Sequence, residues 1–384
     1  MQKLLRIVSL GSRSGKYGGP FDTATRQSVI AARSGLDVTL LYGVLPQDAP
    51  ALKRDLGFRV IDPEVRSLSR RFEFSSLFSP SAVRAIVRAV READVVHVSV
   101  AREFIPVLGA LVAVIGRKRL VLQAHGMISG RPVFFFRPVD WLLRFCFRRA
   151  SKIVVLTRFE LDDLTEWFGD EIDNFVVLGN PLPEVSLAEF DHDSTASEED
   201  DARVVFAARL HPRKRVLDFA DAASVARENG WAERYLVFGP DHGDLSELME
   251  HSAMGSQLQY CGSVSPDTLV EKVRKADVFV LCSDNEPWGN VLATAIALEV
   301  PVVVTKSSAL AGDIEHYGAG IVIDDRSPTA LAQAVHSIVS DVERAESIRN
   351  GCVRMREGML GRPVQEEALL GLYRSALTVR PGNG

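Results

Sequence analysis

Short apolar runs alternate with amphipathic segments along almost the whole chain, and this alternation restricts the possible fold more than any other feature. The apolar runs have the length of strands, whereas the segments between them carry apolar residues at helical spacing. Strands that alternate with helices form parallel sheets whose two faces are covered by the helices. The sequence therefore predicts an α/β fold with buried parallel strands.

The expected strands fall into two groups, which are separated by a region without such a pattern. They are residues 4–10, 37–42, 95–100, 120–124, 153–157 and 175–178 in the first group, and 204–208, 235–238, 258–261, 277–282, 301–305 and 320–323 in the second. The region between them, 181–202, is rich in Pro, Ser, Asp and Glu, which is typical of a linker or an exposed loop. We predict two doubly wound domains in tandem, with helices such as 22–34 and 81–92, and a final helix at 364–377.

Length and composition exclude several classes of protein. A chain of 384 residues is longer than one core usually supports, and 46% hydrophobic with 25% charged residues excludes a largely disordered chain. The longest uncharged apolar stretch, 104–116, has 13 residues, whereas a membrane helix needs about 20. The N-terminal apolar residues stop at Leu10 without a cleavage site, and the four cysteines form no C-x-x-C pair. We expect a cytoplasmic protein without disulfides or zinc.

The two halves of the chain differ in charge. Residues 1–180 hold 26 Lys and Arg against 18 Asp and Glu, net +8, whereas the remainder holds 19 against 32, net −13. A basic half suggests an anionic partner, such as a membrane surface, a phosphorylated lipid or a nucleic acid. The acidic second half argues against nucleic acid. A solvated face of arbitrary sign is the simpler alternative.

The glycine-rich loop after the first strand matches neither of two well-known phosphate-binding motifs. A P-loop has four residues between its glycines and Ser or Thr after its lysine, but here three residues separate the glycines and Tyr17 follows Lys16. The G-x-G-x-x-G fingerprint is also absent, which argues against a dehydrogenase. Gly18 and Gly19 stand just before a helix whose N-terminal amides would suit an anion, and an ordinary strand-to-helix turn is the alternative.

Two loops after strands of the second group carry residues suited to a phosphorylated sugar. Residues 209–215 contain five cationic or potentially cationic side chains between a strand and a helix, a position where they would clamp phosphate. An exposed basic loop is the alternative. The strand ending at Cys282 leads to Glu286 and then to Gly289 at the start of a helix. A carboxylate accepts bonds from hydroxyls, while free amides at a helix start hold phosphate oxygens.

Taken together, these loops and several other residues resemble the GT-B glycosyltransferases, specifically the family-4 retaining enzymes that use nucleotide-sugar donors. The matching residues occur in the family's order and spacing over nearly the whole chain. They are Gly18-Gly19-Pro20, His125-Gly126, Asn180-Pro181, Arg209 with Lys214, Gly239, and Glu286-Pro287-Trp288-Gly289. The resemblance implies two Rossmann-like domains that face each other across a cleft. Residues 1–182 would bind the acceptor and 183–361 the donor, and a helix at about 362–384 would cross back to the first domain.

The resemblance also implies roles for individual residues of the second domain. Arg209 and Lys214 would bind the diphosphate of the donor and stabilise the leaving group, in place of a metal ion. Glu286 would bond to hydroxyls of the donor sugar, and Gly239 would be among the donor-binding residues. The amides of Gly289, Asn290 and Val291 would contact the sugar or the phosphate.

In the first domain, the resemblance implies that His125 approaches the reacting sugar and that Gly18 and Gly19 line the cleft. A satisfied core histidine is the alternative for His125. No metal or other cofactor is expected. Asp191 and Asp193 form an Asp-x-Asp sequence, but they lie in the acidic linker and are not assigned to a metal site.

The sequence departs from the family pattern at two positions. Thr294 stands eight residues after Glu286, where the family has a second glutamate on the donor ribose. A neutral hydroxyl is a weaker acceptor than a carboxylate, so this change affects the expected nucleotide affinity. Arg215 follows Lys214 at a position where the family usually has glycine.

The implied function is a retaining, metal-independent hexosyl transfer from a nucleotide sugar to a saccharide or lipid-linked acceptor, in cell-surface polysaccharide or glycolipid biosynthesis. In a front-face transfer, the departing diphosphate accepts the proton of the acceptor, so the main task of the protein is to stabilise the negative charge of the diphosphate. Two alternatives remain. One is a nucleotide-sugar epimerase with the same fold, and the other is a non-catalytic partner protein, which Thr294 makes conceivable.

A mixed aromatic and basic segment of the first domain suggests a membrane surface. Residues 131–152 interleave eight large apolar side chains with six cations, a combination that suits the headgroup boundary of an anionic membrane. They are Phe134, Phe135, Phe136, Trp141, Leu142, Leu143, Phe145 and Phe147, with Arg131, Arg137, Arg144, Arg148, Arg149 and Lys152. The alternative is a helix at 140–150 whose Leu142, Phe145 and Cys146 belong to the core. We expect a cytoplasmic protein that binds peripherally to the inner face of the membrane.

Overall fold

The computed structural model describes residues 1–11, 19–48, 56–68, 75–128, 137–169, 171–182 and 202–378. Contacts divide the chain into two compact units: Met1–Pro181 together with Gln365–Gly384, and Leu182–Val364. We call them unit 1 and unit 2. The expected boundaries were 182 and 361, and in the structure the chain leaves unit 1 after Pro181 and returns to it at Gln365.

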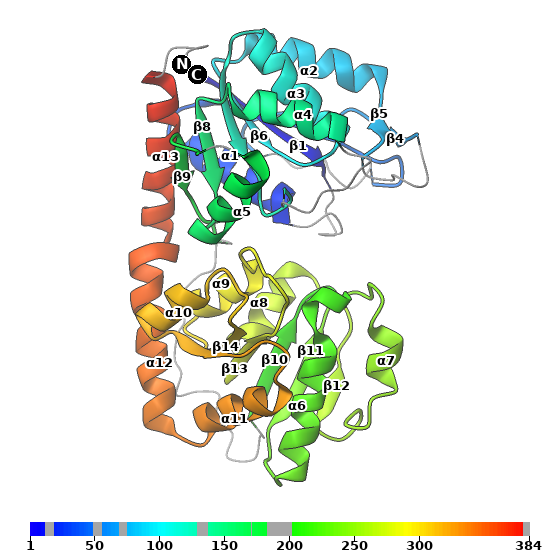
Figure 1. Ribbon diagram of the computed structural model, residues 1–384, viewed down its shortest axis with the longest axis vertical. Coiled ribbons are helices and arrows are strands. Elements are labelled where there is room, and N and C mark those ends of the chain that lie inside the picture. Colours follow the sequence, from blue (N-terminus) through cyan, green and yellow to red (C-terminus); the bar gives the residue numbers. More distant parts are fainter. Residues whose placement is uncertain are drawn as a thin grey trace. The chain divides into compact units, whose positions relative to one another are not determined.

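Unit 1 contains a seven-stranded sheet in the order β3-β2-β1-β6-β7-β8-β9, in which every strand pairs in parallel with its neighbours (Figure 1). The strands are β1 (Lys3–Leu10), β2 (Asp37–Gly43), β3 (Arg59–Ile61), β6 (Val95–Ser99), β7 (Arg119–Gln123), β8 (Lys152–Val155) and β9 (Phe175–Val177). The helices are α1 (Gly19–Arg33), α2 (Pro80–Glu92), α3 (Phe104–Ile115), α4 (Arg137–Phe147), α5 (Arg158–Phe168) and α13 (Arg362–Thr378). A small antiparallel pair joins β4 (Arg66–Ser67) to β5 (Leu77–Phe78).

Unit 2 contains a six-stranded parallel sheet in the order β12-β11-β10-β13-β14-β15. The strands are β10 (Arg203–Ala207), β11 (Arg234–Phe238), β12 (Leu258–Tyr260), β13 (Val278–Leu281), β14 (Val302–Thr305) and β15 (Gly320–Ile323). The α-helices are α6 (Val216–Glu228), α7 (Leu245–Met249), α8 (Pro266–Arg274), α9 (Asn290–Ala297), α10 (Ala311–Tyr317), α11 (Pro328–Val339) and α12 (Val342–Met355). A 3-10 turn spans Pro212–Lys214, and a π-helical turn spans Arg356–Leu360.

The prediction of two doubly wound α/β domains is confirmed, because both large sheets are parallel and the order in which strands are added reverses at a central strand pair. All of the expected strands are present, with ends that differ by no more than two residues. Two helix starts were predicted too late. Helix α1 begins at Gly19 and not at residue 22, and α4 covers Arg137–Phe147 and not 140–150. Both starts contain Pro, which suits the first helical turn because its missing N–H needs no partner there.

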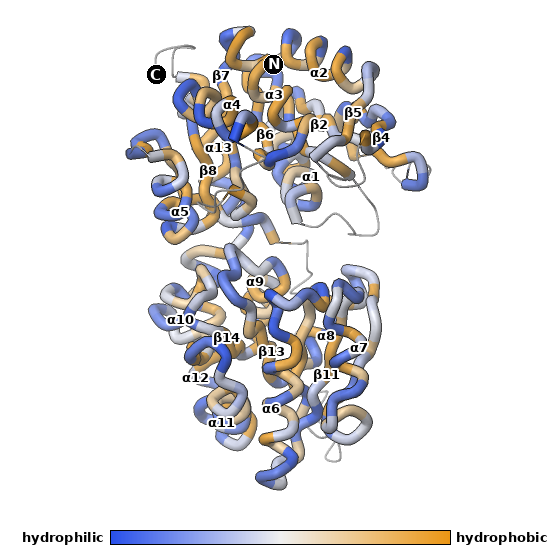
Figure 2. The backbone as a smooth tube through the Cα atoms, turned by 45° about the vertical axis from the view of Figure 1, so that its right-hand side comes forward, coloured by the Kyte–Doolittle hydropathy of each residue, from blue (hydrophilic) through white to orange (hydrophobic). Residues whose placement is uncertain are grey.

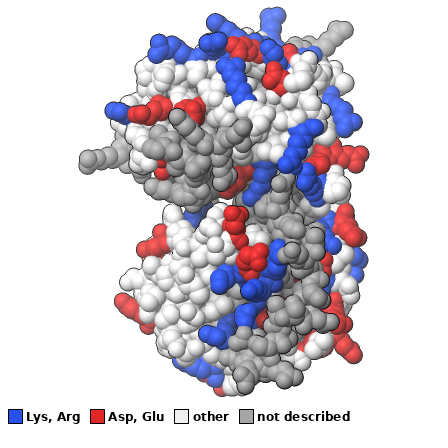
Figure 3. All heavy atoms as spheres, turned by 180° about the vertical axis from the view of Figure 1, so that it is seen from behind, with Lys and Arg blue, Asp and Glu red and all other residues white. Residues whose placement is uncertain are grey.

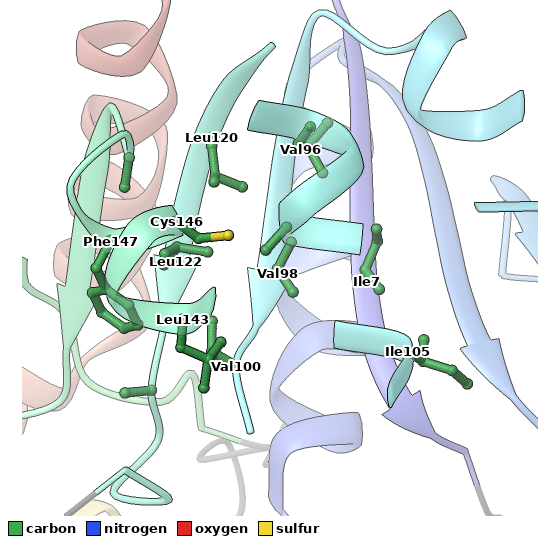
Figure 4. Packing of buried hydrophobic residues seen from close by; sticks show 14 of the residues in the cluster. Ile7, Val96, Val98, Val100, Ile105, Leu120, Leu122, Leu143, Cys146 and Phe147 are labelled. Carbon is green, nitrogen blue, oxygen red and sulfur yellow. The ribbon is translucent and has the colours of Figure 1, made fainter. Parts of the chain in front are cut away.

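The main core of unit 1 lies between the sheet and helices α3 and α4. Figure 4 shows Ile7, Val96 and Val98 of the strands between Cys146 of α4 and Ile105 of α3, in the same hydrophobic cluster. All five side chains are completely buried. The tube in Figure 2 is orange along inner strands such as β13, whereas helices such as α5 and α12 mix blue and orange, as expected for strands buried on both faces.

Helix α13 covers the opposite face of the same sheet. Its apolar residues pack with side chains of β1, β6, β7 and β8 that alternate with those of the main core. They are Leu369, Leu372, Tyr373 and Ala376, against Leu4, Val95, Val121 and Val154. The prediction that the C-terminal helix packs on the first domain is therefore confirmed.

We predict that Leu372→Ala destabilises unit 1 by about 2–5 kcal/mol, because it removes a buried side chain and leaves a cavity between α13 and the sheet. Urea denaturation followed by tryptophan fluorescence measures the change. The matched control is Arg374→Ala on the exposed side of the same helix, which should change stability by less than about 0.5 kcal/mol. Equal effects of the two substitutions would contradict the packing described for α13.

Candidate active site

Strands β10 and β13 are neighbours at the centre of the unit 2 sheet. The strands that follow β10 in the chain are added on one side of this pair, and those that follow β13 are added on the other side. In open α/β sheets, ligands bind outside the carboxyl ends of the strands at such a point. The loop after β10 leads into the turn Pro212–Lys214, and the loop after β13 leads into α9. The amide of Asp284 donates a 2.8 Å hydrogen bond to the carbonyl of Arg213 and joins the two loops. The loops that carry most of the expected site residues therefore lie side by side.

Lys214 and Glu286 form an ion pair between these loops. The Lys214 ammonium donates to Oε2 of Glu286, and the two side chains are only 13% and 7% exposed. The thiol of Cys282, at the end of β13, donates to the carbonyl of Arg215 at 3.2 Å and holds the turn against the strand. A buried charge without a partner is costly, so each of the two charged groups stabilises the other in this position.

Arg209 belongs to the same loop as Lys214 and is exposed. It is the second residue after β10, and its carbonyl accepts a 2.8 Å bond from the amide of His211. The imidazole Nδ1 of His211 in turn accepts a 3.1 Å bond from the amide of Arg213, which caps the short turn. The backbone of the loop is thus ordered, while the guanidinium of Arg209 stays accessible to a ligand.

Gly239 allows the end of β11 to approach the loop after β10. Its φ is +145°, and a Cβ atom at this position would lie 1.8 Å from the carbonyl oxygen of Ala208. The hydroxyl of Tyr260 donates a 2.9 Å bond to the carbonyl of Gly239. Any side chain at Gly239 would displace Ala208 and with it the adjacent Arg209, so the glycine acts through backbone position and not through a contact of its own.

Helix α9 directs its N-terminus to the same edge of the sheet. Gly289 is its N-cap with φ +73°, and it has no side chain that could accept bonds from the amides of Asn290 and Val291. The N-terminal amides of a helix are the groups that bind an anion in many proteins. Thr294 is buried one turn later, and its hydroxyl donates a 2.9 Å bond to the carbonyl of Asn290. Its oxygen therefore keeps only acceptor capacity for a ligand.

His125 belongs to unit 1, where it follows β7. Both His125 and Gly126 have positive φ, +54° and +69°, so the chain makes a left-handed turn at this point. Nε2 of His125 lies 3.0 Å from the hydroxyl of Ser99. Burial and, to a smaller extent, the charge of Arg6 lower the pKa of His125 to about 3, although the hydrogen bond with the side chain of Asn180 acts in the opposite direction. The imidazole is neutral at physiological pH.

Glu160, which the sequence analysis did not identify, holds the turn that contains His125. The side chain is 3% exposed and accepts bonds from the amides of Gly126 and Leu156, which follow the neighbouring strands β7 and β8. Thr157 caps α5 by accepting a 3.2 Å bond from the amide of Glu160. The spacing Thr157-x-x-Glu160 is that of a capping box, so the sequence contained a signal for this residue.

Arg6 was also missed, because it stands inside an apolar run that predicted only a buried strand. It is completely buried, and within the described residues no carboxylate forms an ion pair with it. Its guanidinium donates to Gln27 at 2.8 Å, to the carbonyl of His97 at 3.1 Å and to Gln123 at 3.1 Å. Nδ1 of His97 lies 3.0 Å from the hydroxyl of Tyr373 on α13. This polar cluster fixes the strands that lead to Ser99 and His125.

The structure distributes the expected site residues over both units. Unit 2 brings eight of them to one sheet edge: Arg209, Lys214, Gly239, Glu286, Gly289, Asn290, Val291 and Thr294. Unit 1 holds His125 after β7 and Gly19 at the first position of α1. Gly18, like Asp191 and Asp193 of the acidic linker, lies outside the described residues.

Two family models match adjoining parts of the chain. The model of glycosyl transferases group 1 matches residues 188–352, and that of glycosyltransferase family 4 matches residues 27–183. The chain belongs to the family-4 type of GT-B glycosyltransferases. The loops with Arg209, Lys214 and Glu286 thus lie in the region of the group 1 model.

Relatives and solved structures of this family are similar to the chain at low identity. A D-inositol 3-phosphate glycosyltransferase of Acidothermus cellulolyticus is 26% identical over 249 residues, which are 60% of this chain and 54% of the relative. A glycosyltransferase of Methanocaldococcus jannaschii is 29% identical over 158 residues, 41% and 40% of the two chains. The matches therefore span about half the length of these relatives.

Two crystal structures share the fold of the chain. A glycosyltransferase from Rickettsia africae has a TM-score of 0.73 at 14% identity and covers 98% of this chain and 99% of its own. HepE of Anabaena, solved in complex with UDP, has a TM-score of 0.72 at 16% identity and covers 97% and 100%. In this glycosyltransferase, none of the described helices is long and apolar enough to cross a bilayer.

The structure explains how Arg215 replaces the glycine of the family pattern. Arg215 has φ +56°, a left-handed conformation that favours glycine. Its guanidinium forms two hydrogen bonds with the buried carboxylate of Asp218, of 3.0 and 2.5 Å, and this contact raises the pKa of Arg215. The two-bond contact offsets the backbone strain, so the turn keeps its shape without glycine.

We predict that His125→Gln weakens the pH dependence of stability. The pKa of this histidine is about 6.5 in the unfolded chain and about 3 in the folded protein. The unfolded state therefore binds the proton first as the pH falls, and the free energy of unfolding decreases between pH 6.5 and pH 3. Between pH 7.5 and pH 5 this one group should cost the wild type about 2 kcal/mol. Urea denaturation at both pH values should show that the variant loses about that much less. An equal loss in both proteins would contradict the buried, neutral state of His125.

Proposed function

We propose that this glycosyltransferase moves a hexosyl unit from a nucleotide sugar to a saccharide or lipid-linked acceptor, with retention of configuration and without a bound metal ion. The observation that carries the proposal is the buried pair of Lys214 and Glu286 beside the N-terminus of α9. A cation, a carboxylate and the N-terminus of a helix at one sheet edge suit a ligand that has both phosphate and hydroxyl groups.

In the proposed reaction, the bond between the anomeric carbon and the diphosphate breaks while the acceptor oxygen bonds to the same face of that carbon. The proton of the acceptor hydroxyl passes to the departing phosphate oxygen. Negative charge therefore develops on the diphosphate, and we assign its stabilisation to Arg209 and Lys214 together with the amides of Asn290 and Val291.

The remaining residues orient the sugar in this proposal. Glu286 accepts hydrogen bonds from donor hydroxyls with the carboxylate oxygen that Lys214 leaves free. His125 is a neutral imidazole in unit 1 and is the proposed contact to the reacting sugar. Glu160 supports it as a positioning residue through the amide of Gly126.

The names of relatives support the donor and acceptor classes. The relative from Acidothermus cellulolyticus is a D-inositol 3-phosphate glycosyltransferase, and HepE has been solved with UDP and with UDP-glucose. TarM of S. aureus has been solved with UDP and alpha-GlcNAc-glycerol. We therefore propose a nucleotide-sugar donor, a hydroxylated acceptor, a role in cell-surface polysaccharide or glycolipid synthesis, and a cytoplasmic location.

A nucleotide-sugar epimerase or a non-catalytic partner protein are the alternatives, and one assay separates them. The full-length protein is incubated with single nucleotide sugars, with and without a mixture of saccharide acceptors, and the released nucleoside diphosphate is measured. A transferase releases it only when an acceptor is present. Epimerisation changes the donor without an acceptor, and a non-catalytic protein leaves every donor intact.

We predict that Arg209→Ala and Lys214→Ala each lower kcat/KM by about a hundredfold, because each removes one charge-assisted contact to the leaving group, worth about 3 kcal/mol. The exposed Arg209 can be removed without loss of a buried partner, so its variant should keep the melting temperature of the wild type. The matched control is Arg213→Ala in the same loop, which should keep wild-type activity. Wild-type turnover by the Lys214 variant would refute the proposed contact between Lys214 and the diphosphate.

We predict that donor binding survives chelators and that Thr294→Glu tightens nucleotide binding or leaves it unchanged. The substitution restores a carboxylate at the position where the family binds the donor ribose, one helical turn after the amides of α9. Isothermal titration with nucleoside diphosphates, with and without EDTA, measures both effects. A strong dependence on added manganese would contradict the metal-free proposal, and a loss of nucleotide binding by the variant would place the ribose elsewhere.

Association with an anionic membrane stays a prediction. Phe134, Phe135, Phe136 and Arg131 lie outside the described residues. In the rest of that segment, Trp141 is 69% exposed, whereas Arg144 and Arg149 lie over the rings of Trp167 and Phe145. Acidic side chains also lie among the basic ones of unit 1 on the face drawn in Figure 3. Sedimentation with anionic and neutral vesicles at low salt decides it, and equal or absent binding to both would refute it.

A further inference from the structure

A pocket of about 490 Å³ opens on one face of the unit 2 sheet, between strands β10 to β12 and helix α8. Residues of β11 alternate between the two faces, with Leu236 and Phe238 in the pocket and the buried Tyr235 and Val237 on the opposite face. Leu236, Phe238 and the nearby Val264 give the pocket an apolar floor. A volume of this size is typical of small-ligand sites.

Four cations line the same pocket. Arg203 and Arg234 stand opposite each other at the starts of β10 and β11, and Lys272 and Lys275 come from the end of α8. Among the residues that the structure describes, no carboxylate lines the pocket, and Arg234, Lys272 and Lys275 form no ion pair. Like charges gathered around a concave surface repel one another and attract an anion.

The pocket differs in position from the proposed diphosphate site. Arg203 begins β10, whereas the loop with Arg209 and Lys214 follows the end of that strand at Ala207. Arg203 and Ala207 are four positions apart along the strand, a length of about 13 Å. The other end of the pocket, with Phe238, Cys261 and Val264, lies at the carboxyl ends of β11 and β12, toward the edge that carries the proposed donor site. The donor nucleotide is therefore the rival occupant that a test must exclude.

We propose that this pocket binds a phosphorylated amphiphile, with its phosphate on the four cations and its hydrocarbon on Leu236 and Phe238. Phosphate esters are the anions that Arg and Lys hold with strong charge-assisted bonds, and the apolar floor adds affinity for an attached chain. A membrane phospholipid and a free phosphorylated metabolite with an apolar group share this chemistry. The proposal does not depend on the reaction proposed above.

Cys261 provides a direct readout of the pocket. It lines the pocket beside Lys272 and Arg234, and it is partly accessible, whereas Cys146, Cys282 and Cys352 are buried. Burial raises the pKa of the Cys261 thiol, while the two cations act in the opposite direction. Alkylation of Cys261 by iodoacetamide, a neutral reagent, therefore reports whether the pocket is occupied.

The experiment measures the alkylation rate of Cys261 in the full chain by mass spectrometry, with and without dihexanoyl phosphatidate. At about ten times its Kd, this soluble lipid should slow alkylation about tenfold. Dihexanoyl phosphatidylcholine, which has the same chains and no net charge, should have little effect. Lys272 and Arg234 are exposed residues of the pocket, and the variants Lys272→Glu and Arg234→Gln should lose the protection. Arg344 is an exposed cation away from the pocket, and the control variant Arg344→Glu should retain the protection.

Further arms separate the sources and the rivals. Protection by the short-chain lipid alone assigns a free ligand, and protection by vesicles that contain phosphatidate as well assigns a membrane lipid, so either result supports the proposal. Protection by inorganic phosphate at the same concentration would show that the apolar floor contributes nothing and would overturn it. Equal protection by UDP would make the pocket part of the donor site, and unchanged alkylation with phosphatidate would also refute the proposal.

Discussion

Parallel strand pairing is the constraint on which both units depend. Because neighbouring strands in the two large sheets run in the same direction, their carboxyl ends meet at one edge. Lys214 and Glu286, which are 72 residues apart in the chain, therefore contact each other after β10 and β13. The same constraint places the turn of His125 after β7 beside the start of α5, where Glu160 binds it. The candidate site follows from the topology before any single contact is considered.

The two units bury charge in different ways. In unit 2, Lys214 and Glu286 neutralise each other. In the proposed complex, the phosphate of the ligand contacts Lys214 and its hydroxyl groups contact Glu286. In unit 1, Arg6 is buried among neutral acceptors, and burial lowers its pKa to about 10, which still leaves it charged at physiological pH. That charge disfavours protonation of the nearby His97 and His125. A neutral imidazole and a paired lysine are thus consequences of where charge is buried.

Backbone conformation explains which family positions tolerate change. Gly239 meets the carbonyl of Ala208 so closely that no side chain fits, and a Cβ atom on Gly289 would lie 2.9 Å from Leu281. Arg215 has a positive φ as well, but its side chain points to Asp218 and space is available. A requirement for φ alone can therefore be met by another residue with a suitable partner, whereas a requirement for space cannot.

The sequence by itself determined the strands of the two sheets except β3, the two doubly wound domains and the loops with Arg209, Lys214 and Glu286, because apolar periodicity and the residues after each strand are local properties. The short, partly exposed β3 has no such apolar run and was not predicted. The tertiary structure alone decided the pairing of Lys214 with Glu286 and the burial of Arg6 among neutral partners. It also gathered the cations of β10, β11 and α8 around one pocket. These contacts join side chains that are far apart in the chain, and no local pattern encodes the distance between them.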